Sequence, residues 1–417
     1  MASRSTAAAL AVAAAATALV VAMVAYPEVA FQAAVRGLKL WWDEVFPALL
    51  PFFIGGQVLM GLGVVHFVGV LLEPFMRPLF NLPGVGGFVT AMGLASGYPI
   101  GALLTARLRR DRLITAVEGE RLMSFANTAD PLFMAGAVAV GMFGQPEVAG
   151  VLVAAHYIGA VLTGFALRFY RPWDPPSPPP AAQLQGSMIR RAVQALVEAR
   201  RQDGRPLGQL LGDCVRDSVQ TLLLIGGFII LFSTLLDIAQ MAGLTRALAA
   251  ALAAGLRPLG LDPATGPALV AGFFEITLGT QLSAQAPAPL LDRLVAASAV
   301  IGWAGLSVHG QVAAIIQGTG MRLAPYIAAR LLHAVAAGAV TVWLLREGVP
   351  EALLRLGPAW AASAAAAAAS PAARAWESLE RLVLAVGAVL ALALLAEGAR
   401  RLVGAGWRAA AARGGRP

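Results

Sequence analysis

The chain has 417 residues, of which 58% are hydrophobic and only 13% are charged, whereas about a quarter of the residues in an ordinary soluble domain are charged. So little charge argues against a soluble enzyme, a nucleic-acid-binding protein or a disordered scaffold. The formal net charge of +8 comes mainly from arginines between apolar runs, where basic residues set membrane orientation. We therefore expect a lipid bilayer, and no nucleic acid, as a partner.

Apolar runs suited to crossing a bilayer recur along the chain. A spanning helix needs about 20 apolar residues, and the candidate segments are 7–26, 46–65, 148–169, 219–236, 326–345 and 382–395. The first segment could also be a signal peptide that is removed, with Arg4 as its charged start. The segment 28–44 mixes apolar and charged residues, and it predicts an interfacial helix with Trp41 and Trp42 at the headgroup level.

Two linkers divide these runs into blocks. The Pro-rich residues 172–180 lie in a cytoplasmic Pro/Arg-rich linker, 171–215, which we expect to contain one amphipathic helix. An Ala-rich linker, 347–380, leads to a C-terminal transmembrane helix and basic tail, 381–417. The remaining blocks are the N-terminal region 1–45, a first unit 46–170 and a second unit 216–346.

The two units flanking the central linker resemble each other. The matching residues all lie 180 positions apart (77 to 257) without a gap, which indicates an internal repeat. They are Arg77, Pro78, Leu79, Pro83, Gly86 and Ala91 in the first unit and Arg257, Pro258, Leu259, Pro263, Gly266 and Ala271 in the second.

The charges at the ends of the apolar runs predict that the units have opposite orientations. In the first unit, 84–104 enters and leaves on the arginine-rich side as a re-entrant hairpin, and 113–143 then crosses as a broken helix. The equivalents in the second unit are the hairpin 266–284 and the broken helix 291–320. We therefore predict an all-α polytopic membrane protein with two inverted-topology repeats, re-entrant hairpins and broken transmembrane helices, an architecture of secondary transporters.

In the first unit, two segments place polar or helix-breaking residues at membrane depth, where irregular backbone is tolerated only inside protein or around a water-filled cavity. Ser96, Gly97 and Tyr98 interrupt the hairpin, either as part of a binding site or as a helix kink with a packed tyrosine.

Asn127, Thr128 and Asp130 lie just before Pro131, which disfavours helical geometry at the residue before it. Their spacing fits helix capping as well as ligand binding. An acid in a membrane segment is costly unless it is paired or functional.

The second unit offers polar residues at the corresponding places. Glu275 and Thr277 interrupt the hairpin, and Glu275 could carry a proton or cation or pair with Arg322. Ser307, His309 and Gln311 alternate as on a non-helical stretch. His309 is either a structural histidine or, with Glu275, a candidate for coupled proton movement.

The sequence contains few residues that could bind a cofactor or carry out catalysis. Cys214 is the single cysteine, and the four histidines are too far apart to form a metal-binding pair, so we predict no cofactor and no metal. Ser307 and His309 could be drawn as part of a catalytic triad, but nothing resembles a nucleophile elbow. A phosphate-binding loop for ATP is also missing from the sequence, and we predict that the protein is not an enzyme.

The motifs around these segments carry a family resemblance. They are Ser96 to Ala102, Leu113 to Thr115, Glu120 to Leu122, Ser124 to Thr128, Pro131 to Phe133, Glu275 to Thr277, Gly305 to His309, and Gln311 with Val312. In order and spacing, over roughly 46–345, the chain resembles the YlbJ-type sporulation integral membrane proteins. That family belongs to the nucleoside-recognition Gate group, which resembles concentrative nucleoside transporters.

The resemblance implies a role in endospore formation and a place in the outer forespore membrane. It implies movement of dipicolinic acid, a small aromatic dicarboxylate, out of the mother-cell cytosol. The chain departs from the family pattern at Ala129 and Asp130, where small neutral residues are more usual, and in the C-terminal span beyond Pro350.

We therefore expect a transporter in a multi-pass bacterial cell membrane, with half-helix N-termini supplying positive potential in place of a buried cation. The alternatives are a carrier of nucleosides or other small solutes, and a non-transporting sporulation membrane scaffold. A homo-oligomer is compatible with the sequence but not indicated by it. The predicted binding residues for a small anionic substrate are Ser96, Gly97, Tyr98, Asn127, Thr128, Asp130, Glu275, Thr277, Ser307, His309 and Gln311.

Overall fold

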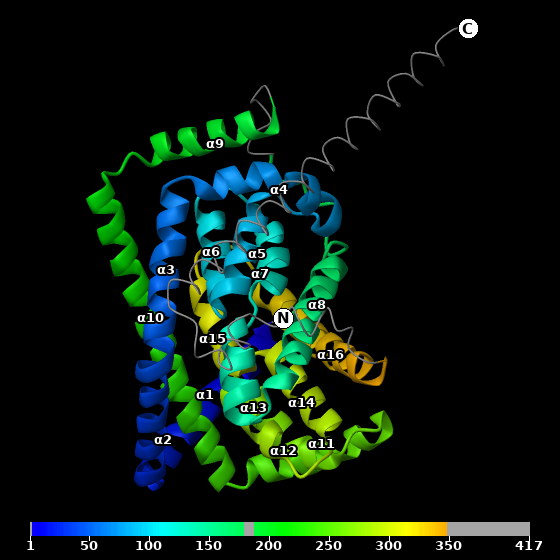
Figure 1. The fold of residues 1–417 in the computed structure, drawn as a ribbon. Coiled ribbons are helices and arrows are strands. Elements are labelled where there is room, and N and C mark those ends of the chain that lie inside the picture. Colours follow the sequence, from blue (N-terminus) through cyan, green and yellow to red (C-terminus); the bar gives the residue numbers. More distant parts are fainter. Residues whose placement is uncertain (1, 179–186, 348–417) are drawn as a thin grey trace, which may run out of the picture.

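The computed structural model describes residues 2–178 and 187–347, and every regular element in these ranges is helical (Figure 1). The first elements are α1 (Ala2–Ala25), α2 (Pro27–Leu40), the π-helical η1 (Trp41–Val45), α3 (Phe46–Gly61), α4 (Val64–Phe80), α5 (Val85–Ser96) and α6 (Ile100–Arg110). They are followed by α7 (Ala116–Ala126), the π-helical η2 (Leu132–Met142), η3 (Pro146–Val148), α8 (Ala149–Leu167) and α9 (Met188–Asp203). The last are α10 (Leu207–Met241), α11 (Leu244–Leu256), η4 (Arg257–Leu259), η5 (Pro263–Thr265), α12 (Gly266–Phe274), α13 (Ile276–Gln285), α14 (Leu290–Trp303), α15 (Gly305–Ile315) and α16 (Leu323–Glu347).

The described chain contains four helical segments that are long and apolar enough to cross a membrane, and two bent helix pairs that qualify if each is one span. The four segments are Pro146–Leu167, Leu207–Met241, Leu290–Ile315 and Leu323–Arg346. The bent pairs are Ala16–Ala25 with Pro27–Asp43, at 106°, and Leu49–Gly61 with Val64–Phe80, at 81°. The prediction of an all-α polytopic membrane protein is confirmed. The predicted C-terminal helix and tail, 381–417, and all of the linker 347–380 except Glu347 lie outside the described residues.

The helix expected over 28–44 is not a separate element, because it runs on into the following helix. Helix α2 continues through η1 into α3 without a non-helical residue and packs along α10. Trp41 is buried, and its indole Nε1 donates a hydrogen bond to the Leu222 carbonyl at 2.9 Å. The ring fits there because Gly226 leaves room for it, since a Cβ on Gly226 would lie 2.7 Å from the indole. Trp42, in contrast, is exposed.

The two repeats correspond helix by helix. The continuous helix 27–61 and α10, at 207–241, are separated by the same 180-residue offset as the matching sequence motifs, and so are the starts of α4 and α11. The hairpin α5–α6 corresponds to α12–α13, the broken helix α7–η2 corresponds to α14–α15, and α8 corresponds to α16. In Figure 1, α4 crosses one end of the molecule and α11 the opposite end, with one hairpin extending inward from each. The repeats are therefore inverted.

The amphipathic helix expected in the central linker is α9, which lies across the same end of the molecule as α4 (Figure 1). Its apolar face packs on α4 through Met188, Ala192 and Ala195, which contact Val70 and Leu71. Arg190 and Arg201 of α9 are exposed to the outside, as an amphipathic surface helix requires.

A charged elbow joins α9 to α10. Arg205 donates side-chain hydrogen bonds to Asp203 and Asp213, and its bond to Asp203 holds the pKa of that carboxyl below its ordinary value. A lowered pKa keeps the carboxylate charged at neutral pH, so the stabilising contact is lost only as the pH falls through that lowered value.

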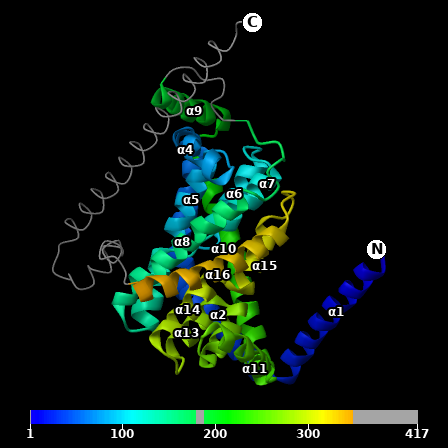
Figure 2. The same ribbon diagram turned by 90° about the vertical axis from the view of Figure 1, so that its right-hand side faces the viewer.

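At the N-terminus, α1 stands away from the helical body (Figure 2). It contains the first predicted span, 7–26, and turns sharply at Tyr26 into α2. Its few contacts to the body are with α2 and α10.

We predict that Gly37→Ala destabilises the protein. A Cβ at Gly37 would lie 2.9 Å from Ile230 Cα, so α2 would have to move away from the backbone of α10. Overpacking of this kind costs about 1–3 kcal/mol, and we expect a lower apparent Tm in detergent. The matched control is Gly227→Ala on α10, where an added Cβ meets nothing within 4 Å. Equal melting temperatures for the two variants would contradict the close approach of α2 and α10.

Candidate functional site

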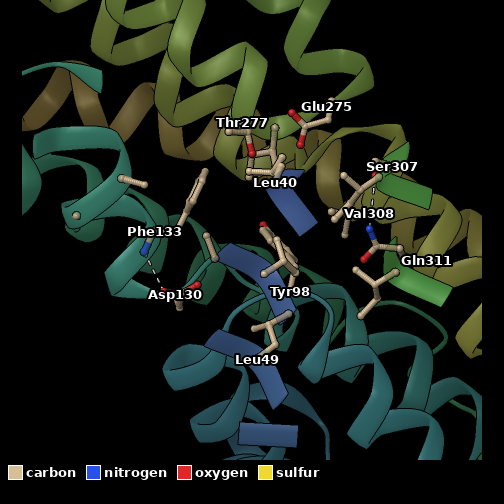
Figure 3. A pocket seen from close by; sticks show the side chains of 17 residues that line it. Leu40, Leu49, Tyr98, Asp130, Phe133, Glu275, Thr277, Ser307, Val308 and Gln311 are labelled. Atoms are coloured by element: carbon tan, nitrogen blue, oxygen red, sulfur yellow. Dashed lines mark hydrogen bonds between the residues drawn. The ribbon is translucent and has the colours of Figure 1, made fainter. Parts of the chain in front are cut away.

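A cavity of about 310 Å³ lies between the two repeats (Figure 3). Its wall takes residues from the breaks of both hairpins and from the second halves of both broken helices. The lining residues are Leu40, Val45, Leu49, Tyr98, Ala129, Asp130, Phe133, Gly136, Ala137, Ile225, Ile229, Glu275, Ile276, Thr277, Ser307, Val308 and Gln311.

The cavity lies where the internal symmetry of the fold would place it. Val45 and Leu49 line one side, and their equivalents at the 180-residue offset, Ile225 and Ile229, also line it. The same apolar positions of the two long helices therefore face one space. A site between inverted repeats, surrounded by discontinuous helices, is the arrangement found in secondary transporters.

The first hairpin breaks at Gly97, Tyr98 and Pro99, and Tyr98 lines the cavity. The Tyr98 hydroxyl donates to the Ile301 carbonyl at 2.9 Å, so the hairpin of one repeat is tied to α14 of the other. Gly97 has φ +77° and lies against Asp130, because a Cβ there would be 2.5 Å from Oδ2. A glycine is needed to bring these two breaks so close together.

The break between α7 and η2 is held by its own polar side chains. Asp130 accepts a hydrogen bond from the Phe133 amide at 2.9 Å, which caps the start of the second half. Asn127 accepts from the Ala102 amide at 3.3 Å and donates to the Tyr326 hydroxyl at 3.0 Å. Asn127 thus joins three elements from the two repeats, while only Asp130 of this pair lines the cavity.

In the second hairpin, Glu275 both lines the cavity and caps α13. Its backbone is extended, and its carboxylate accepts from the Leu278 amide at 2.8 Å. The alternative in which Glu275 pairs with Arg322 is wrong. Arg322 lies directly before α16 and pairs instead with Glu120, a buried acid on α7, at 3.0 Å.

The second broken helix resumes directly after Ala304, so the expected non-helical stretch is not observed. Ser307 and Gln311 are one turn apart on α15, both line the cavity, and Gln311 Nε2 donates to Ser307 Oγ at 3.4 Å. Because of the helical period, His309 points away from the cavity. Its Nδ1 lies 2.7 Å from the Gly305 carbonyl oxygen, and its ring packs on Trp303.

Six of the eleven predicted residues line this single cavity. They are Tyr98, Asp130, Glu275, Thr277, Ser307 and Gln311. The other five, Ser96, Gly97, Asn127, Thr128 and His309, are buried beside it and hold the breaks or fill the space behind the wall. Within the described residues, no group of three or more His, Cys, Asp or Glu could hold a metal ion.

Two buried residues behind the wall were missed. Arg330 on α16 donates to the Tyr98 hydroxyl at 3.2 Å and to the Asn127 carbonyl at 3.0 Å. His156 on α8 accepts from the Ala129 amide at 3.0 Å through Nε2. The expectation that the site has no buried cation is therefore wrong. The sequence contained a signal for Arg330. It is the single Asp, Glu, Lys or Arg within the predicted span 326–345, and a charged residue in a span is a candidate functional residue.

Comparison with known proteins assigns the family. A family model described as "Gate: Nucleoside recognition" matches residues 43–163. The sporulation integral membrane protein YlbJ of Bacillus subtilis (strain 168) is 46% identical over 327 residues, which cover 78% of this chain and 80% of that protein. The chain belongs to the YlbJ family of sporulation integral membrane proteins. Among solved structures, CNTnw in an inward-facing substrate-bound state superposes on this YlbJ-family chain with a TM-score of 0.36 and 13% identity, over 77% of this chain and 84% of CNTnw.

We predict that Asn127→Ala lowers the stability of the fold. The substitution leaves the buried Ala102 amide without its acceptor and removes the donor to Tyr326. An unsatisfied buried group costs about 1–3 kcal/mol, which we expect to appear as a lower apparent Tm in detergent. Tyr326→Phe, which removes only the second of these bonds, should lose less. A Tm for Asn127→Ala at or above that of Tyr326→Phe would contradict the bridging role.

Proposed function

We propose that this YlbJ-family chain transports a small anionic solute, and that the solute is dipicolinic acid, moved from the mother cell toward the forespore during sporulation. The observation that carries the proposal is the cavity at which the interrupted segments of both repeats meet. Membrane spans, inverted repeats and a site between them are what alternating access needs. The name of the B. subtilis relative supports the link to sporulation, and we propose the outer forespore membrane as the location.

The size and wall of the cavity suit a flat aromatic acid. Its volume of about 310 Å³ lies at the lower end of the roughly 300–1,000 Å³ typical of small-molecule sites. Most of the wall is apolar, with Phe133 and Tyr98 among the lining side chains. Thr277, Ser307 and Gln311 supply hydroxyl and amide groups that can hydrogen-bond carboxylate oxygens.

The two acids in the wall do not conflict with an anionic solute. Asp130 and Glu275 each accept a backbone amide at the start of a helical segment. The negative charge at each site is partly offset by these bonds and by the positive end of the helix dipole. Buried Arg330 adds a positive charge directly behind Tyr98.

The direct test is uptake of labelled dipicolinate into vesicles that contain only this purified protein. We expect saturable uptake, and we expect Ser307→Ala to weaken it about two- to tenfold, as the loss of one net hydrogen bond implies. Thr163→Ala is the matched control, because it also removes a buried hydroxyl, one that bonds only within α8 and does not line the cavity.

The outcomes separate transport from a scaffold. A scaffold should show no saturable flux with folded, inserted protein, and it should tolerate Ser307→Ala in sporulating cells. Flux that Ser307→Ala and Thr163→Ala reduce equally would argue against the cavity as the binding site.

A second candidate function is nucleoside transport, which the description of the matching family model favours. The test adds uridine and dipicolinate together to the same vesicles. Competition between them for uptake would show that both solutes use one site. Uptake of uridine without uptake of dipicolinate would replace the first candidate with the second.

A further inference from the structure

The residue that the proposed function leaves unexplained is Arg330. Its side chain is fully buried, and α16, which carries it, is one of the four candidate spans. It donates to three neutral oxygens, the Tyr98 hydroxyl and the carbonyls of Asn127 and Ser124. Its Nε has no partner, and none of the described carboxylates forms an ion pair with it.

A structural role accounts for the bonds of Arg330 and for part of its charge, because the guanidinium lies at the C-terminal end of α7 and 5.6 Å from the centre of the Tyr326 ring. The carbonyls of Ser124 and Asn127 lie at the C-terminal end of α7, where a donor is needed. The equivalent residue of the other repeat, His156, also binds this break, as an acceptor from an amide. His156 and Arg330 are each the eighth residue of their helices, both are fully buried, and both bind the backbone between α7 and η2.

His156 is uncharged in this position. Its Nε2 accepts a hydrogen bond from the Ala129 amide, so that nitrogen carries no proton. One of the two equivalent positions therefore does its structural work without charge. A cation at the other, inside a membrane span and without a carboxylate partner, marks a site for an anion from outside the protein.

The guanidinium lies directly behind the cavity wall. Tyr98 lines the cavity, as Figure 3 shows, and its hydroxyl is 3.2 Å from Arg330 Nη1. The three hydrogen bonds use three of the five N–H donors of the guanidinium. Both N–H groups of Nη1 are occupied, so a carboxylate reaches Nη1 only if it displaces the Tyr98 hydroxyl, while the bonds to the Asn127 and Ser124 carbonyls keep Arg330 attached to α7.

We infer that Arg330 is the residue that makes the cavity select carboxylates, and that a substrate carboxylate replaces the Tyr98 hydroxyl on its guanidinium. This inference rests on the proposed function, since it assigns the charge that an anionic solute needs. The inference requires that the solute has at least one carboxylate, which charge-assisted hydrogen bonds from Arg330 would hold.

The experiment compares two probes of the same shape on the purified full-length chain, dipicolinate and the uncharged pyridine-2,6-dicarboxamide, by calorimetric titration in detergent. The wild type should bind dipicolinate more tightly. Arg330→Gln should weaken dipicolinate by about 10- to 100-fold, as expected for hydrogen bonds to a charged group, while the dicarboxamide changes little. Arg330→Lys should keep part of the preference. Arg346→Gln, an exposed arginine on the same helix, should keep all of it.

Tyr98→Phe gives a test that does not depend on the folding of the Arg330 variants. It removes the hydroxyl that competes for Nη1 and keeps the ring, so the preference for dipicolinate over the dicarboxamide should rise. An unchanged or smaller preference would overturn the inference, as would a folded Arg330→Gln protein with the wild-type preference. Transport of dipicolinate by the wild type would then still stand. A wild type that binds and transports neither probe would instead reject the proposed function.

Discussion

The fold depends on how the interrupted backbone between α7 and η2 is satisfied inside the membrane. Lipid offers no hydrogen bonds, so every exposed amide and carbonyl at this break needs a partner from the protein. Arg330 donates hydrogen bonds to the carbonyls of Asn127 and Ser124. His156 accepts a hydrogen bond from the Ala129 amide, and Asp130 accepts one from the Phe133 amide. These partners come from α8, from α16 and from the break itself. The interrupted backbone of the first repeat is therefore hydrogen-bonded to a helix of the second repeat, and these bonds hold the two repeats together.

The same constraint explains why acidic side chains line a largely apolar cavity. Asp130 and Glu275 belong to different repeats and to different kinds of interruption, a broken helix and a hairpin. Each accepts the amide three residues ahead, and so each begins a new helical segment at membrane depth. The same two carboxylates therefore cap a helical segment and line the cavity, because both segments begin at the space between the repeats.

The inverted repeats are symmetric in backbone and asymmetric in chemistry. Val45 and Ile225 place equivalent apolar groups on the cavity wall, whereas the equivalent positions on α8 and α16 hold a neutral His156 and a charged Arg330. Symmetry brings four interruptions to one place. The departures from symmetry set the charge and shape around the cavity.

The sequence by itself determined three of the spans (148–169, 219–236 and 326–345), the 180-residue repeat, both hairpins, both broken helices and six residues of the cavity wall. These follow from local hydrophobic runs and from Pro, Gly and polar residues within them. Only the tertiary structure decided which acid Arg322 pairs with, that Trp41 packs into α10, and that His309 faces away from Ser307. The position of Arg330 behind Tyr98 was likewise decided there. Each of these depends on contacts between segments far apart in the chain or on the rotation of a helix about its axis, which neither composition nor spacing specifies.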